Sequence, residues 1–449
     1  MTPLAAVILA AGQGTRMKSK LPKGLHRLAG KPMLEYLVEA AALVTGAAPV
    51  LVVGHGAEQI RAAFGEKAGY VTQAEQKGTG HAVRQAEAAL KGKCEHVLVI
   101  NGDLPLLEAG SLQAVVAAQL QNPGPLTLLS VLSDRITDFG RVVRGPDGAV
   151  HSVIEEAQLG PEHRRISEFN VGAYCFRAAW LWEALARLPL SPKHEYYLTD
   201  TIHLAVSDGL RVEAVTIDDD RQALGINNRV QLAELEAEMR RRINAHWMTE
   251  GVTLIDPAST YIAATVQIAR DTTLLPNTHL WGSTSVGEDC VLGPNTIVRD
   301  TAIGNRCQVE CSVLEGAWLA DEVKVGPFAH LRQGARLERG VHMGNFGEVK
   351  NSTLGPGTKL GHFSYIGDAV IGADVNIGAG TITCNFDGTR KSPTEIGEGA
   401  FIGSDTMLVA PLKVGQRART GAGAVVTKNV PDDSLAVGMP ARVIRKLKS

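Results

Sequence analysis

The sequence is short of aromatic residues and lacks a strong charge of either sign. Of its 449 residues 5% are aromatic, and the formal net charge is -2 at pH 7. A protein that binds nucleic acid usually carries a basic stripe, so this chain is expected to have no nucleic-acid partner. The 48 glycines instead indicate much backbone in turns and in close approaches.

The sequence also lacks paired cysteines and long hydrophobic runs. None of the six cysteines forms a CxxC pair, which argues against a zinc site and favours free thiols in a reducing compartment. The apolar run over residues 4–11 has no basic leader and is far shorter than the roughly 20 residues that span a bilayer. We therefore expect no membrane partner and a cytoplasmic location.

Residues 1–226 are predicted to form an α/β domain with a Rossmann-like, mostly parallel sheet. Apolar runs such as AAVILA, PVLVVG and HVLVI alternate with helical patterns such as MLEYLVEAAALV. This alternation is typical of βαβ units, in which helices cover both faces of the sheet. Ligands of such sheets bind outside the carboxyl ends of the strands.

A linker helix is predicted over residues 227–250. Apolar residues recur there at steps of three and four, with charges between them, which is the pattern of one amphipathic helix. The helix is expected to join two domains.

Residues 251–449 are predicted to form a second domain, in which apolar residues return every six positions from about residue 260. Four series show this period: Leu280 to Val298, Val325 to Val349, Leu354 to Ile366 and Ile396 to Val426. The period is the hexapeptide signature of a parallel β-helix, in which each hexad forms one side of a coil. The interruption at 381–395 is predicted to protrude as a loop, and beyond Val430 the chain is predicted to leave the coil as a basic tail.

The segment LAAGQGTRMKSKLPKGL places glycines and four cations after the first predicted strand. Gly12 and Gly14 would begin a dinucleotide-binding GxGxxG motif, but Met17 stands where the third glycine belongs. Backbone N–H groups at the glycines, with Arg16 and Lys23, suit a polyphosphate. A solvated turn with surface lysines is the alternative.

Motifs along both halves resemble those of one family. The first loop is similar to the signature of sugar-nucleotide pyrophosphorylases, and the match continues through QAEQKGTGHA, VINGDLPLL, DFGRV, EFNVGAYCF, EYYLTD and GINNRVQL. With its hexapeptide half, the chain resembles the bacterial bifunctional N-acetylglucosamine-1-phosphate uridyltransferase / glucosamine-1-phosphate acetyltransferase family along almost its whole length. The resemblance implies a left-handed β-helix and homotrimers formed through it.

The resemblance also implies two reactions that make UDP-N-acetylglucosamine for the bacterial cell wall. In the first, acetyl-CoA acetylates glucosamine 1-phosphate. In the second, N-acetylglucosamine 1-phosphate and UTP react with the help of Mg²⁺ and release pyrophosphate. Because the sugar phosphate is already an anionic nucleophile, the second reaction needs positioning and charge neutralisation rather than a protein base.

In the uridyltransferase half, the resemblance assigns most site residues. UTP would contact Leu9, Ala10, Ala11, Gly12, Lys23, Gln73, Gly78 and Thr79, the sugar would contact Gly140, Glu155 and Asn170, and Asn227 would contact substrate as well. Arg16 and Lys23 are the expected catalytic cations. Backbone capping is a plainer explanation for Gln73 and Asn170. Asn101 departs from the family, which often has an aromatic residue before GD.

A metal site is predicted at Asp103 and Asn227. Asp103 follows the strand HVLVI at a carboxyl end of the sheet, although an ordinary turn aspartate would also fit there. The resemblance makes Asn227 the second ligand; from the residues alone, Asn227 and Asn228 could merely cap the next helix. Mg²⁺ accepts so sparse a set because it keeps water and substrate phosphate oxygens as further ligands.

In the acetyltransferase half, the resemblance makes His362 the catalytic base, which would remove a proton from the attacking amine. Substrate would contact Arg332, Lys350, Tyr365 and Asn376, and acetyl-CoA would contact Ala379, Asn385, Phe386, Ser404 and Ala422. Phe386 replaces the family's usual Tyr and loses a hydroxyl hydrogen bond. A trimer implies acetyl sites built from more than one subunit. An ordinary surface histidine and solvated charges are the plainer alternative.

Two other functions remain open. The chain could be a single-function sugar nucleotidyltransferase whose β-helix only oligomerises, but then the acetyl-site residues would not all be needed. It could also be a non-enzymatic assembly factor, which should lack Asp103 or the cations of the first loop.

Overall fold

The computed structural model describes residues 4–135 and 139–446. The chain separates into two compact units, residues 1–239 and 240–449. The boundary lies inside α8 (Arg229–Thr249), the helix expected over the linker. In the part of the chain that the structure describes, no helix is both long and apolar enough to cross a membrane.

The first unit is built on a mixed, mostly parallel sheet, as predicted. In spatial order its strands are β11 (Val212–Ile217), β7 (Leu126–Leu132), β10 (Glu168–Arg177), β6 (His96–Asn101), β1 (Leu4–Ala10), β4 (Val50–Val53) and β5 (Gly69–Thr72). A hairpin of β8 (Arg141–Arg144) and β9 (Val150–Ile154) pairs beside β10. Among the strands in the spatial order, only β10 runs antiparallel to its neighbours, β6 and β7.

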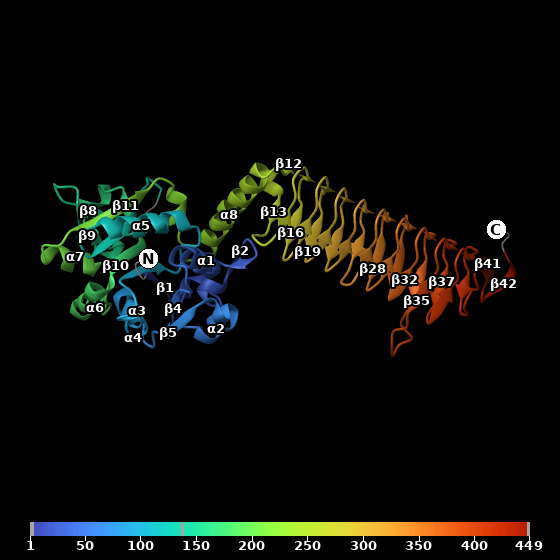
Figure 1. Cartoon of the computed structure of the whole chain (residues 1–449), viewed down its shortest axis with the longest axis horizontal. Helices are drawn as coiled ribbons and strands as arrows, with labels where there is room; N and C mark the ends of the chain where they lie inside the picture. Colours follow the sequence, from blue (N-terminus) through green and yellow to red (C-terminus); the bar gives the residue numbers. More distant parts are fainter. Residues whose placement is uncertain (1–3, 136–138, 447–449) are drawn as a thin grey trace. The chain divides into compact units, whose positions relative to one another are not determined.

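Helices cover both faces of this sheet (Figure 1). One face holds α1 (Met33–Thr45), α2 (Ala57–Phe64) and α5 (Ala109–Gln121). The other holds α3 (Thr79–Arg84), α4 (Glu87–Leu90), α6 (Ala178–Arg187) and α7 (Asp200–Ser207). Because both faces are covered, successive residues of β1 enter different cores: Ile8 lies in the first and Val7 in the second.

The second unit is a parallel β-helix whose coils stack into three faces (Figure 1). The first face runs from β12 (Thr253–Leu254) to β42 (Ala441–Lys446). The second runs from β13 (Tyr261–Ile262) to β40 (Val425–Val426), and the third from β14 (Gln267–Ile268) to β38 (Leu412–Val414). Strands of successive coils pair in parallel, for example β28 (Gly347–Lys350) with β31 (Ser364–Gly367).

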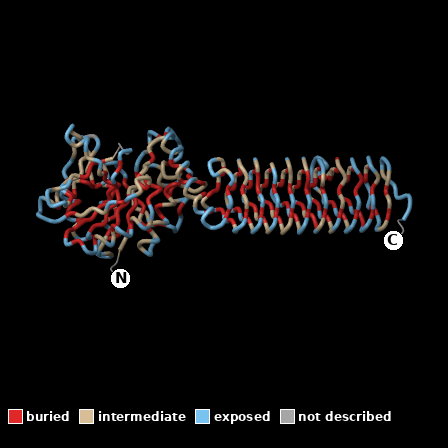
Figure 2. Tube along the Cα trace, turned by 90° about the horizontal axis from the view of Figure 1, so that it is seen from above, coloured by how far each residue is buried: buried red, intermediate tan, exposed pale blue. Residues whose placement is uncertain are grey.

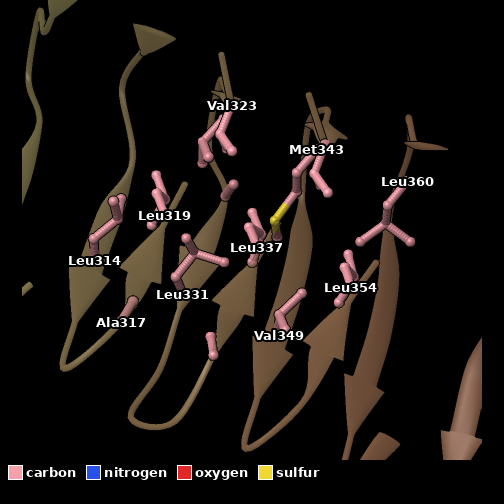
Figure 3. Packing of buried hydrophobic residues seen from close by; sticks show 14 of the residues in the cluster. Leu314, Ala317, Leu319, Val323, Leu331, Leu337, Met343, Val349, Leu354 and Leu360 are labelled. Atoms are coloured by element: carbon pink, nitrogen blue, oxygen red, sulfur yellow. The ribbon is translucent and has the colours of Figure 1, made fainter. Parts of the chain in front are cut away.

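The predicted hexad residues line the inside of the coils. Leu331, Leu337, Met343 and Val349 are wholly buried, and Figure 3 shows their side chains packing against those of neighbouring coils. Every residue of the other three series is buried as well, and Figure 2 shows buried segments along the interior of all the coils. No hexad could bury its apolar residue alone, so stacking of the coils creates this core.

Glycine follows many hexad residues because successive coils approach closely there. A Cβ built on Gly355 would lie 2.5 Å from the backbone of Gly372 in the next coil, and one on Gly372 would lie 2.6 Å from the backbone nitrogen of Glu398. Neither glycine has a positive φ. Close stacking, rather than a left-handed turn, therefore requires glycine at these positions.

The loop predicted at 381–395 is present between β34 (Ile382–Cys384) and β35 (Thr394–Ile396), where the chain projects away from the coils (Figure 1). The predicted exit after Val430 is wrong. Strand β41 (Ser434–Gly438) pairs in parallel with β39 (Arg419–Thr420), and β42 then returns antiparallel to it. The apolar period did not reveal this coil because small residues, Ser434 and Ala436, are buried in its interior in place of large apolar ones.

Replacing Leu337 by alanine should lower the free energy of unfolding by about 2–5 kcal/mol, because the neighbouring coils cannot close the cavity left by this fully buried side chain. Urea unfolding followed by circular dichroism measures the loss. Lys324→Ala, at an exposed position of β24 (Lys324–Val325), is the control and should change stability by less than about 0.5 kcal/mol. A loss for Leu337→Ala no larger than that of the control would contradict the packing.

Candidate active sites

A cavity of about 340 Å³ opens at the carboxyl ends of β1 and β6. Leu9 pairs with Asn101 in the sheet, and the N–H of Gly102 donates to the carbonyl oxygen of Leu9 over 2.9 Å. This approach needs glycine, because a Cβ on Gly102 would lie 2.4 Å from that oxygen. The two strand ends therefore run side by side into the cavity.

The residues predicted to contact UTP all line this cavity: Leu9, Ala10, Ala11, Gly12, Lys23, Gln73, Gly78 and Thr79. Arg16 is exposed in the short 3-10 helix Thr15–Met17 and is not among the described lining residues. Sequence reasoning missed Pro22, Gly24, Gln76, Glu195 and Tyr197, which also line the cavity. The EYYLTD motif was a signal for the last two. Asn101, which departs from the family pattern, lines the cavity too.

Asp103 and Asn227 are brought together by one cation. The Nζ of Lys23 donates to Asp103 Oδ2 over 2.8 Å and to Asn227 Oδ1 over 3.1 Å. The residue that caps α8 is Asn228, whose Oδ1 accepts hydrogen bonds from two backbone N–H groups in the first turn of the helix. The side-chain oxygen of Asn227 is instead directed to Lys23, which lines the cavity.

This pair fits a divalent cation in its donor chemistry. One carboxylate and one amide oxygen converge on a single positive charge, and both are hard ligands of the kind that Mg²⁺ takes. Among the described residues there is no cluster of three or more His, Cys, Asp or Glu that could hold a metal ion. Further ligands would have to come from water or from substrate phosphate.

The residues predicted to hold the sugar also lie together. The N–H of Asn170 donates to the carbonyl oxygen of Gly140 over 2.9 Å, and a Cβ on Gly140 would lie 3.2 Å from the carbonyl of Ile154, next to Glu155. The Asn170 side chain donates to Tyr174 Oη over 2.7 Å and accepts from the N–H of Gly172 over 3.2 Å. Asn170 therefore also has the local structural role that was its plainer explanation.

Burial raises the pKa of the Glu155 carboxyl above its ordinary value, although the Thr199 hydroxyl donates to it over 2.7 Å and opposes the shift. Because the folded-state pKa is the higher one, burial costs nothing below the unfolded value of about 4.5, where both states are protonated. The cost grows as the pH rises from the unfolded value toward the folded-state pKa. Burial of Glu155 thus destabilises the fold at neutral pH.

Replacing Glu155 by glutamine should therefore raise the melting temperature at pH 7, and this gain should shrink as the pH falls toward 4.5. Thermal unfolding at a series of pH values measures the difference. Glu66→Gln, at an exposed position, serves as the control and should show no such trend. A gain that grew toward acid pH would contradict the burial argument.

Four residues predicted for the acetyl site stack at one corner of the coils. His362 follows β30 (Lys359–Leu360), and Ala379, Ser404 and Ala422 take the same place on later coils, after β33 (Asn376–Ile377), β36 (Phe401–Ile402) and β39. Hydrogen bonds step from coil to coil along this corner: from the N–H of residue 380 to the carbonyl of 363, from 405 to 379, and from 423 to 404. His362, Ser404 and Ala422 are exposed at this corner.

A second group gathers on the next face of the β-helix. Lys350 is in register with Gly367, and a Cβ on Gly367 would lie 2.4 Å from Tyr365 Oη and 2.9 Å from Asn385 Nδ2. Arg332, which follows β25 (His330–Leu331), donates to Glu348 over 2.8 Å. Tyr365 lies on β31 of the same face, three residues after His362 and therefore close to the corner in sequence.

Sequence reasoning missed Lys391. The charge of Lys391, and then that of Arg332, lowers the pKa of Lys350 below its ordinary value. Lys391 and Arg332 therefore each lie close enough to Lys350 to repel its charge, as expected where an anion binds. Lys391 belongs to the protruding loop, where it forms a bridge with Phe386, and the six-residue period says nothing about residues that interrupt it.

Asn376 lies apart from the second group. It belongs to β33 in the first face of the β-helix, whereas Lys350 and Tyr365 belong to the second. Phe386 is 58% exposed at the start of the loop. One chain thus presents its predicted acetyl-site residues on a corner and on both adjoining faces.

Comparisons with known proteins match both units. The model of the MobA-like NTP transferase domain matches residues 6–195, and that of the hexapeptide repeat of succinyl-transferase matches residues 283–311 and 393–428. A bifunctional protein GlmU from Exiguobacterium sibiricum is 45% identical over 433 residues, 96% of each chain. Another from Trichlorobacter lovleyi is 46% identical over 443 residues, 98% of this chain and 96% of the relative. The chain belongs to the GlmU family of bifunctional proteins.

Membership of this family confirms the fold class. The first unit is a nucleotidyltransferase domain, and the second is a left-handed parallel β-helix of hexapeptide repeats that carries the second transferase activity. A further relative, from Carboxydothermus hydrogenoformans, is 44% identical over 441 residues, 98% of each chain. These relatives match both units, so neither half of the chain is an unrelated addition.

Proposed function

We propose that this chain makes UDP-N-acetylglucosamine in two steps, one in each unit. The β-helix transfers the acetyl group of acetyl-CoA to glucosamine 1-phosphate, and the α/β unit joins the product to UTP and releases pyrophosphate. The observation that supports this most directly is that all the residues expected to contact UTP line one cavity. Relatives that match nearly the whole chain are bifunctional proteins.

The uridylyl step is a matter of positioning and charge. A phosphate oxygen of the sugar attacks the α-phosphorus of UTP, and the bond to the β-phosphate breaks, so no protein base is needed. Lys23, which lines the cavity beside the strand ends, would neutralise phosphate charge, and Arg16 would add a second cation from the exposed loop outside the described lining. Gly12 leaves the backbone open on the same side, since a Cβ there would have no neighbour within 4 Å.

Asp103 and Asn227 would hold Mg²⁺ in this step. When bound, the ion would neutralise and orient phosphate oxygens. Gln73 is buried at the cavity wall, where its Nε2 donates to the carbonyl of Gly78 over 3.1 Å. That hydrogen bond orients the side-chain amide and leaves its oxygen to accept from the uracil N–H. Gly140, Glu155 and Asn170 would hold the acetylated sugar beside this cavity.

The acetyl step needs a base and an anion site. His362 accepts the proton of the sugar amine as the nitrogen attacks the thioester carbonyl, and the CoA thiolate leaves. Arg332, Lys350 and Lys391 supply the positive charge for the sugar phosphate, and Tyr365 lies beside them. Ala379, Ser404 and Ala422 continue the corner from His362 and give acetyl-CoA a surface along several coils, with Asn385 and Phe386 at the loop.

A homotrimer through the β-helix would complete the acetyl site. Asn376 and Lys350 lie on different faces of one β-helix. A ligand that contacts both residues would therefore bind between two neighbouring chains, and each chain would supply one of them. Sedimentation equilibrium tests the trimer. We propose a cytoplasmic location for the enzyme, where its free cysteines would stay reduced.

The alternative, a nucleotidyltransferase with a non-catalytic β-helix, is not favoured. If the β-helix were not catalytic, residues of the acetyl site should be missing. Instead, the chain has all four of the residues expected there, at one corner and one face of the β-helix: His362, Arg332, Lys350 and Tyr365. The relatives are bifunctional over the same length.

Each half-reaction is tested separately. Protein with glucosamine 1-phosphate and acetyl-CoA should release CoA thiol, and protein with N-acetylglucosamine 1-phosphate, UTP and Mg²⁺ should release pyrophosphate. If only pyrophosphate appears, the β-helix is not an acetyltransferase. If only thiol appears, the assignment of the cavity to UTP is wrong.

A further inference from the structure

We propose that the ammonium group of Lys23 and the divalent cation exchange for one place between Asp103 and Asn227, so that metal binding and nucleotide binding are coupled through this lysine. The inference rests on the proposed metal site. It assigns to Lys23 a positioning role that the proposed reaction does not require.

The geometry makes the two cations mutually exclusive. Lys23 Nζ lies 2.8 Å from Asp103 Oδ2 and 3.1 Å from Asn227 Oδ1. A small divalent ion would bind these same oxygens at a shorter distance, about 2.0–2.1 Å for Mg²⁺, and would occupy the same space. An ammonium left beside it would repel it strongly, because the site is only partly solvated, with Lys23 and Asp103 side chains 18% and 35% exposed.

The charge balance points the same way. Asp103 supplies one negative charge and Asn227 none, so Lys23 alone already neutralises the pair. Among the described residues no third acidic, histidine or cysteine side chain joins them as a metal cluster. The free protein therefore offers a divalent ion a site that is already filled and already neutral.

The ammonium group of Lys23 can move while the backbone and Cβ of this residue stay in place. The backbone of Lys23 opens the short helix Lys23–Leu25, and the N–H of His26 donates to its carbonyl over 3.2 Å. Gly14 lies against the stem, since a Cβ on Gly14 would be 3.0 Å from the Cβ of Lys23. The same side chain lines the nucleotide cavity, so its ammonium can turn from the carboxylate to a phosphate.

The consequence is cooperative binding. A triphosphate in the cavity would attract the ammonium of Lys23 away from Asp103 and Asn227 and open the metal site. By thermodynamic linkage, the metal would strengthen nucleotide binding by the same factor. In the free protein, Lys23 compensates the negative charge of Asp103 beside Asn227.

Mn²⁺ binding measured by electron paramagnetic resonance, with no nucleotide present, tests the exchange. Lys23→Met removes the charge and keeps the length of the side chain, and it should bind Mn²⁺ about 10-fold more tightly than the natural protein. Lys20→Met removes the same charge from an exposed position of the same loop and should leave the affinity within about 2-fold. Adding UTP should tighten Mn²⁺ binding to the natural protein more than to Lys23→Met.

The outcomes separate this inference from the metal site itself. If Asp103→Asn abolishes Mn²⁺ binding but Lys23→Met binds no more tightly than the natural protein, the metal site stands and the exchange is overturned. If Asp103→Asn binds Mn²⁺ as well as the natural protein, the proposed metal site is wrong and the exchange fails with it. Equal tightening by Lys20→Met would show a general charge effect and would also overturn the exchange. Melting curves of both lysine variants check that they are folded.

Discussion

Replacing His362 by alanine should lower the rate of acetyl transfer about 10²-fold or more and leave uridylyl transfer unchanged. The amine of glucosamine 1-phosphate must lose a proton as it attacks the thioester, and His362 is the side chain at the corner shared with Ala379, Ser404 and Ala422. Its exposure in a single chain leaves it accessible to substrate. Release of CoA thiol measures the first activity, and release of pyrophosphate measures the second.

The matched control for this variant is His342→Ala. His342 lies exposed on β27 (His342–Met343), on the first face, away from the corner column. It should retain both activities within about 2-fold. Equal loss of both activities in His362→Ala would indicate damage to the fold, and undiminished acetyl transfer would remove His362 from the reaction.

Replacing Asp103 by asparagine should have the opposite effect. We expect uridylyl transfer to fall about 10²-fold or more at limiting Mg²⁺, because the change removes the only negative charge that the Lys23, Asp103 and Asn227 cluster offers a cation. Acetyl transfer should not change. The loss should shrink as Mg²⁺ is raised, since a weakened ligand set is filled at higher concentration.

Asp218→Asn is the control for this change. Asp218 is an exposed carboxylate of the same unit that does not line the cavity, and its loss should leave both rates unaltered. Undiminished synthesis of the UDP-sugar by Asp103→Asn at limiting Mg²⁺ would remove Asp103 from the metal. A loss that no concentration of Mg²⁺ repairs would point to another role for the carboxylate.

The β-helix was predictable because its signal is repetitive. A six-residue apolar period that continues through whole series determines which side chain faces inward, and each residue of those series is buried. The period failed at Ser434 and Ala436, where small residues fill the interior, and it was silent about Lys391, which lies where the period breaks. Periodicity reports the interior of the coils and not the surface that binds ligands.

The site of the α/β unit was predictable only in part. The motif residues that line the cavity follow strands whose carboxyl ends meet, so the first loop and NGD could be placed together from topology. The contact of Lys23 with Asp103 and Asn227 spans 80 and 204 residues of sequence. No local pattern encodes such a contact, and the sequence did not show which of Asn227 and Asn228 caps α8; in the structure it is Asn228.

The central claim is that one polypeptide performs both transfers on the same sugar. The most direct measurement incubates the purified protein with glucosamine 1-phosphate, UTP, Mg²⁺ and acetyl-CoA carrying ¹³C in the acetyl group, and identifies the nucleotide products by mass. We predict UDP-N-acetylglucosamine in which every molecule carries the label, together with pyrophosphate and free CoA. A uridine product without the label, or one that forms only when N-acetylglucosamine 1-phosphate is supplied, would contradict this account.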